Sequence, residues 1–92
     1  MKRTFEESRR EIRRLILERL VLGRNWGMNY ISKEDVPKGL PKIYPTGWYY
    51  DEIELAREGL LLPYKKRRCY RLNEDVKSVI EALVGKRVPP QY

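Results

Sequence analysis

The chain has 92 residues, of which 41% are hydrophobic and 36% are charged, and it carries a net charge of +7. This length fits one domain with a single small core, and the hydrophobic content argues against disorder throughout. One cysteine and no histidine exclude a Cys/His zinc site, a histidine-activated nucleophile and an intramolecular disulfide. We therefore expect a protein that is not an enzyme, binds no cofactor or metal, and resides in a reducing, cytoplasmic setting.

The N-terminal stretch and the overall composition bear on location and source. The N-terminal stretch MKRTFEESRRE has no apolar core like that of a signal peptide, and no apolar run is long enough to cross a bilayer. We expect no membrane association. Abundant arginine and glutamate, with little asparagine or glutamine, is typical of a thermophile.

The first predicted helix runs from Thr4 to Leu22 and ends at Gly23. Apolar residues recur along it at helical spacing, while its other face interleaves arginines with glutamates that can pair three or four residues apart. We interpret that face as a solvated, salt-bridged surface rather than a DNA-contacting one. Leu17, Val21 and Leu22 widen the apolar stripe beyond the need of a small core, which favours a two-fold homodimer through this helix.

The next segment predicts a short strand and a short helix. Trp26 is expected in the core, and the strand should end before Ser32, which would cap a second helix from Lys33 to about Lys38. Residues 39–45 contain two prolines and cannot be regular helix throughout.

The third predicted helix begins at Thr46, whose hydroxyl would cap it, and ends at Glu58, with Gly59 as a left-handed C-cap. Its periodicity places Glu52 inside the apolar arc, so either the carboxylate pairs with an arginine or the phase of the helix differs by one residue. The apolar stripe of this helix comprises Tyr49, Ile53, Ala56 and Leu60, widened by Trp48 and Leu55.

After Gly59 the pattern changes to a β-hairpin. Leu60, Leu62 and Tyr64 alternate as one strand face, and the residues from 69 to 72 form the returning strand. Between the strands stand four consecutive cations, residues 65–68, at a tip where nothing can bury them. Positive charge is therefore local, and a basic surface attracts polyanions, nucleic acid first.

A closing helix follows the hairpin. Asn73 is a candidate N-cap with acidic residues after it, and Gly85 ends the helix. Its apolar stripe, which would serve as core or dimer seam, comprises Val76, Val79, Ile80, Leu83 and Val84.

Gly-Leu-Leu at residues 59–61 and Tyr-Arg-Leu-Asn at residues 70–73, flanked by helices, resemble the second half of a winged-helix domain. The resemblance implies an α+β fold with a three-helix core, a two- to three-stranded antiparallel sheet that forms the wing, and a closing C-terminal helix. The domain would span residues 1–85, followed by a short tail over residues 86–92. Small winged-helix proteins are familiar as transcription regulators of archaea and archaeal viruses, so the same role is implied here.

The resemblance also implies double-stranded DNA as the partner, bound by a homodimer that pairs through the first and last helices. The basic wing would contact phosphates or the minor groove, the start of the third helix would hold a phosphate, and its outer face would give modest base readout. The predicted DNA-contacting residues are Lys65, Lys66, Arg67, Arg68, Arg71, Lys38, Lys42, Thr46, Tyr50, Glu54 and Arg57.

Two alternatives remain open on the sequence. The outward face of the third helix is net acidic, which opposes phosphate binding and would suit a protein-interaction module that docks on a basic partner. RNA binding, with exposed tyrosines stacked on bases, is the other. Cys69, beside the cations, is interpreted as a small strand residue rather than a redox sensor.

Overall fold

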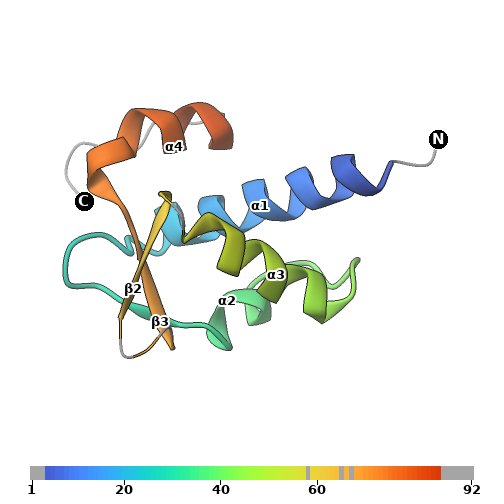
Figure 1. The fold of residues 1–92 in the computed structure, drawn as a ribbon, viewed down its shortest axis with the longest axis horizontal. Helices are drawn as coiled ribbons and strands as arrows, with labels where there is room; N and C mark the ends of the chain where they lie inside the picture. Colours follow the sequence, from blue (N-terminus) through green and yellow to red (C-terminus); the bar gives the residue numbers. More distant parts are fainter. Residues whose placement is uncertain (1–3, 58, 65, 67, 86–92) are drawn as a thin grey trace.

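The computed structural model describes residues 4–57, 59–64, 66 and 68–85. Within them the elements follow the order α1 (Phe5–Leu22), β1 (Ile31–Ser32), α2 (Asp35–Lys38), α3 (Thr46–Ala56), β2 (Leu61–Tyr64), β3 (Cys69–Leu72), the 3-10 helix η1 (Glu74–Val76) and α4 (Lys77–Val84). The strands form one antiparallel sheet in the order β1-β3-β2. Helix α4 lies on one side of α1, and α2 and α3 lie on the other (Figure 1). The chain is thus a small α+β domain, compatible with the winged helix that the sequence predicts.

Helix α1 ends as predicted and begins at Phe5, one residue after the predicted start, with Thr4 as its N-cap. The Glu7 amide donates to Thr4 Oγ1 and the Thr4 amide donates to Glu7 Oε1, each at 3.1 Å, which forms a reciprocal cap. Leu17 and Val21 are only 0% and 7% exposed, on a helix against which α4 packs. The prediction that these residues are surplus to the core was therefore wrong, although Leu22 is 70% exposed.

Strand β1 and helix α2 follow in the predicted order, but the helix is shorter than predicted. Ile31 and Ser32 pair with β3, as the predicted short strand required. Because Ser32 belongs to the strand, α2 begins only at Asp35 and has no side-chain cap, so the predicted capping role of Ser32 was wrong. Hydrogen bonding from Ser32 is instead the largest cause that lowers the pKa of Asp35.

Helix α3 differs from the prediction at both ends. Its N-cap is Pro45, with extended backbone (ψ 139°), and no side chain caps it, so Thr46 is the first helical residue rather than the cap. The helix ends at Ala56, earlier than predicted; Glu58 lies outside the described residues. The C-cap is Arg57, so Gly59 does not cap the helix as predicted.

The buried arc of α3 confirms the unusual position of Glu52. Tyr49, Ile53 and Ala56 are buried as predicted, whereas Leu55 is 52% exposed, contrary to the prediction. Glu52 is 1% exposed. The Nε atoms of two α1 arginines donate to its carboxylate, Arg9 at 2.7 Å and Arg13 at 3.0 Å. This cluster ties α3 to α1.

One face of the sheet packs against the core and the other points away from it. Leu61 lies opposite Leu72, and both are fully buried together with Tyr70. Because side chains alternate along a strand, Leu62 and Tyr64 point away from the core. The predicted strand is therefore present, but it begins at Leu61 rather than Leu60, and the shared face of Leu62 and Tyr64 is the outer one.

The closing segment begins with a 3-10 turn. The Asp75 amide donates to Asn73 Oδ1 at 3.1 Å, so Asn73 caps η1 rather than α4. Gly85 ends α4 in the left-handed conformation (φ 78°), which glycine adopts without strain. The predicted stripe is divided: Ile80 and Val84 are buried, whereas Val79 is 49% and Leu83 45% exposed.

Candidate nucleic-acid interface

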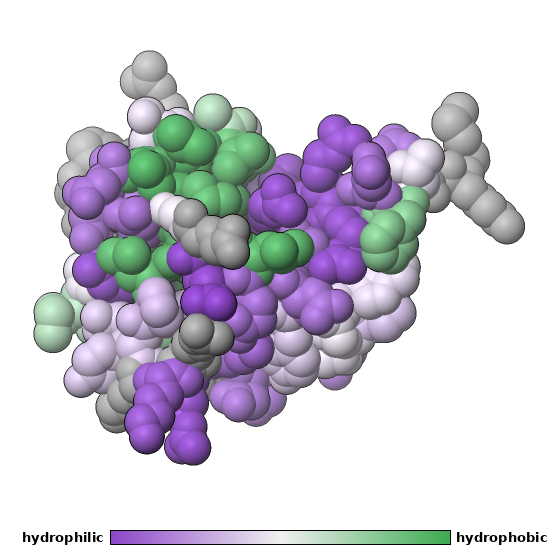
Figure 2. All heavy atoms as spheres, viewed as in Figure 1, coloured by the Kyte–Doolittle hydropathy of each residue, from purple (hydrophilic) through white to green (hydrophobic). Residues whose placement is uncertain are grey.

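The hairpin between β2 and β3 presents cations at its tip. Lys66 and Arg68 are exposed, and hydrophilic residues project at this end of the molecule, at the bottom of Figure 2. The Arg68 amide donates to the Tyr64 carbonyl at 3.2 Å and its carbonyl accepts from the Lys33 amide at 2.8 Å. The backbone of Arg68 is thus anchored on both sides while its side chain faces solvent. The other two predicted tip residues, Lys65 and Arg67, lie outside the described residues.

Arg71, on β3, is less available than the tip residues. Its Nη1 donates to Glu74 Oε1 at 2.5 Å, and its Cζ lies 5.9 Å from the centre of the Tyr30 ring. The hydrogen bond with Glu74 is the largest cause that raises the pKa of Arg71, and the same bond lowers the pKa of Glu74. Its charge is therefore shared with a neighbouring carboxylate, which makes it a weaker candidate for a phosphate contact.

A hollow of about 160 Å³ between α2 and α3 brings four predicted contact residues together. Its lining is Glu34, Pro37, Lys38, Lys42, Tyr44, Thr46, Tyr49 and Tyr50. Lys38 Nζ lies 3.4 Å from Asp35 Oδ1, and both side chains are exposed. Lys42 and Thr46 are also exposed; Thr46 is the first residue of α3, and Lys42 lies in the segment before it. The hollow therefore combines cations, a tyrosine ring and the N-terminus of a helix, a combination that suits a phosphate.

The remaining two predicted residues, Glu54 and Arg57, are engaged within the protein. Glu54 Oε1 accepts from Lys33 Nζ at 2.7 Å and from the Tyr70 hydroxyl at 3.1 Å. Arg57 Nε lies 3.1 Å from Glu54 Oε2. Base readout by Glu54 would require these contacts to break, so the structure disfavours that role. Sequence reasoning missed this network because its members are far apart in the sequence: Lys33 follows β1, Glu54 and Arg57 lie at the end of α3, and Tyr70 lies in β3.

The Glu54 network predicts a specific acid sensitivity. The hydrogen bond from Lys33 is the largest cause that lowers the pKa of Glu54 from its ordinary value of 4.5. A carboxylate with a lowered folded pKa contributes stability that is fully present above its unfolded pKa and is lost as the pH falls through the folded pKa. Lys33→Met should therefore reduce the loss of stability below pH 4.5. Urea denaturation of both proteins between pH 7 and about pH 3 measures this, and equal losses would contradict it.

Comparisons of the chain with protein-family models, curated proteins and solved structures found no match. In the part of the chain that the structure describes, no helix is long and apolar enough to cross a membrane. No three His, Cys, Asp or Glu side chains among the same residues are grouped so that they could hold a metal ion. The function is therefore argued from the surfaces described above.

Proposed function

We propose that this chain is a winged-helix domain that binds double-stranded DNA and acts as a transcription regulator. The observation that carries the proposal is the exposed pair of cations, Lys66 and Arg68, at the end of an anchored hairpin. The hairpin and helix α2 both lie on the side of the molecule away from α4 (Figure 1). One duplex could therefore contact the hairpin tip and the α2–α3 hollow together.

The proposed contacts are mainly with the DNA backbone. The tip cations bind phosphates along the minor groove, and the N-terminus of α3 with Lys42 holds a further phosphate. Asp51 is exposed on α3 and Glu54 is tied to Lys33, so the outer face of this helix offers few partners to base edges. Tyr50 remains the main candidate for contact with a base. We therefore expect the chain to bind duplexes of different sequence with similar affinities.

Titration of a labelled random-sequence duplex of about two helical turns, followed by anisotropy at several salt concentrations, tests the proposal. Backbone-dominated binding should give a dissociation constant of about 1–100 μM at physiological salt and a slope of about −0.9 per neutralised phosphate when log K is plotted against log salt. Absence of binding at low salt would refute the DNA proposal and would favour a protein partner for the acidic face of α3.

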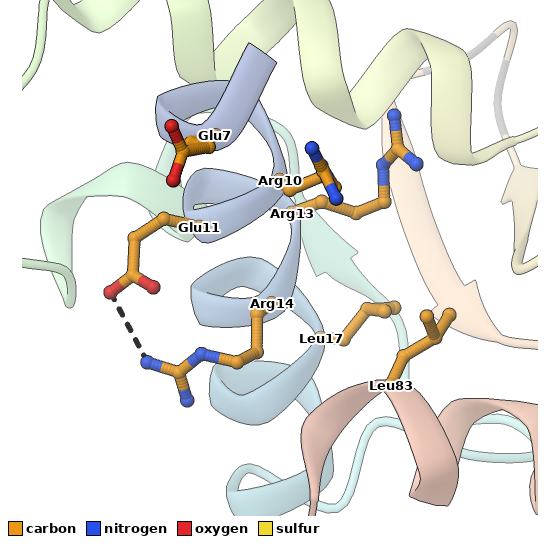
Figure 3. Close-up of a pocket in the computed structure, with 7 residues that line it drawn as sticks. All are labelled: Glu7, Arg10, Glu11, Arg13, Arg14, Leu17 and Leu83. Carbon is orange, nitrogen blue, oxygen red and sulfur yellow. Dashed lines mark hydrogen bonds and ion pairs between the residues drawn. The ribbon is translucent and has the colours of Figure 1, made fainter. Parts of the chain in front are cut away.

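The proposed regulator is a homodimer that pairs through α1 and α4. A hollow of about 390 Å³ runs along α1 beside the end of α4, with Leu17 and Leu83 adjacent at one end and arginines along its length (Figure 3). Leu83, which lines this hollow, is 45% exposed, and Val79, on the same helix, is 49% exposed. A second copy of the chain would cover these apolar residues at a two-fold axis.

The charges of α1 suit such a two-fold contact. Glu7, Arg10, Glu11 and Arg14 line the hollow in that order along the helix. If two α1 helices met antiparallel, Glu7 would face the partner's Arg14 and Arg10 would face the partner's Glu11. Both pairs join opposite charges, so this face is complementary to itself.

Leu83→Glu is expected to shift the protein toward monomer, raising the dimer dissociation constant by at least about tenfold, because a charge would be buried at the contact. Met28→Glu, at a residue that is 86% exposed in the loop after α1, is the matched control and should leave the equilibrium unchanged. Light scattering or sedimentation over a range of protein concentrations measures both. A wild type that stays monomeric throughout would contradict the dimer.

A further inference from the structure

The outer face of the sheet carries an aromatic pair. Tyr64 lies opposite Cys69 in the register, so both side chains share the face that points away from the core. Tyr30, just before β1, stacks on Tyr64 with ring centres 4.6 Å apart and planes inclined by 29°. Two rings from separate segments therefore meet on the surface beside the hairpin tip.

One ring of the pair contacts a cation, and the other ring is partly exposed. The guanidinium of Arg71 lies 5.9 Å from the centre of the Tyr30 ring, and Glu74 holds that guanidinium in place. Tyr30 is half-buried, whereas Tyr64 is 49% exposed. The partly exposed ring of Tyr64 therefore stacks on the ring of Tyr30, which Arg71 contacts in turn.

Two exposed cations follow Tyr64 closely in the sequence. Lys66 and Arg68 are exposed, and the Arg68 amide bonds to the carbonyl of Tyr64 at 3.2 Å. An aromatic ring with neighbouring cations is the combination that binds single strands, because every base has a face to stack and a phosphate to neutralise. In the interior of a duplex those faces are already stacked on neighbouring base pairs.

We propose that Tyr64 is a stacking platform for an unpaired nucleobase of a single-stranded nucleic acid, with Lys66 and Arg68 on the adjoining phosphates. This site goes beyond duplex binding and does not depend on α3 or the α2–α3 hollow. Ribose and deoxyribose strands share the required chemistry. The experiment therefore includes both.

The test uses the full chain and labelled 12-nucleotide strands of one mixed sequence, in DNA and in RNA, with the matching DNA duplex as a third probe. Tyr64→Leu keeps an apolar strand residue but removes the ring, and should weaken binding of at least one single strand by about 5- to 100-fold. Tyr64→Trp keeps a stacking surface and should bind that strand within about twofold of wild type. Thermal denaturation verifies that both variants fold.

The duplex probe separates this proposal from the previous one. Tyr64→Leu should leave duplex affinity within about twofold of wild type, because a paired base offers no free face. A wild type that binds neither single strand at low salt overturns the platform, whether or not it binds duplex. A Tyr64→Leu variant that binds single strands as tightly as wild type overturns it too. If Tyr64→Leu loses single-strand and duplex affinity equally, the proposal is also overturned, because the ring would then serve only to hold the hairpin in its conformation.

Discussion

Replacing both Arg9 and Arg13 with methionine is expected to destabilise the fold by about 3–5 kcal/mol. The carboxylate of Glu52 is 1% exposed and accepts from both arginines, at 2.7 and 3.0 Å. Without them a buried negative charge loses the two partners that offset its desolvation, while methionine preserves much of the apolar stem. Urea denaturation followed by circular dichroism measures the difference in the free energy of unfolding.

Two further variants make this prediction specific to the buried charge. Arg14→Met is a matched control, because its side chain is 38% exposed, against 37% for Arg13, but it pairs with Glu11 and Glu18 along the same helix. Such pairs contribute about 0.3–0.5 kcal/mol each. Adding Glu52→Leu to the double variant removes the buried charge and should recover at least about half of the lost stability. A triple variant no more stable than the double variant would contradict the account.

Changing the two described cations of the hairpin tip is expected to weaken duplex binding by more than about tenfold at low salt and to reduce the salt slope by about 1.8. Lys66 has φ 55°, a left-handed conformation that asparagine tolerates, so the variant is Lys66→Asn with Arg68→Gln. Both side chains are exposed, so removing their charge costs contacts with phosphate rather than packing. Anisotropy titration over a salt series measures both quantities.

The chain offers a close control for the tip variant. Arg24 also has φ 55° and is exposed. The next residue, Asn25, accepts a hydrogen bond from the Leu72 amide at the end of β3 that is far from the hairpin tip. Arg24→Asn is therefore a matched control for Lys66→Asn alone, because both remove one exposed charge at the same backbone conformation. Arg24→Asn should keep duplex affinity within about threefold and the salt slope nearly unchanged. If the two single variants lose affinity equally, net charge rather than the hairpin governs binding.

Local chemistry made much of the fold readable from the residues. The apolar period and Gly23 located α1, and Gly85 marked the end of α4, because terminating glycines and helical spacing depend on residues a few positions apart. The run of cations between apolar segments located an exposed hairpin tip for the same reason. The sequence also indicated that Glu52 pairs with an arginine, though not which one, because a charge within an apolar arc requires a partner of opposite charge.

Contacts between distant elements could not be predicted in this way. Helix α4 packs against α1, on which Leu17 and Val21 are buried, and Lys33 and Tyr70 bind Glu54, a residue that periodicity alone had left free to read bases. Periodicity shows that a face is apolar or charged but not which other element covers it. A pairing register shifted by one residue likewise exchanges the two faces of a strand, so the burial of Leu61 depended on its opposition to Leu72. These outcomes follow from which elements meet in space, and that is a property of the packed domain rather than of any local stretch.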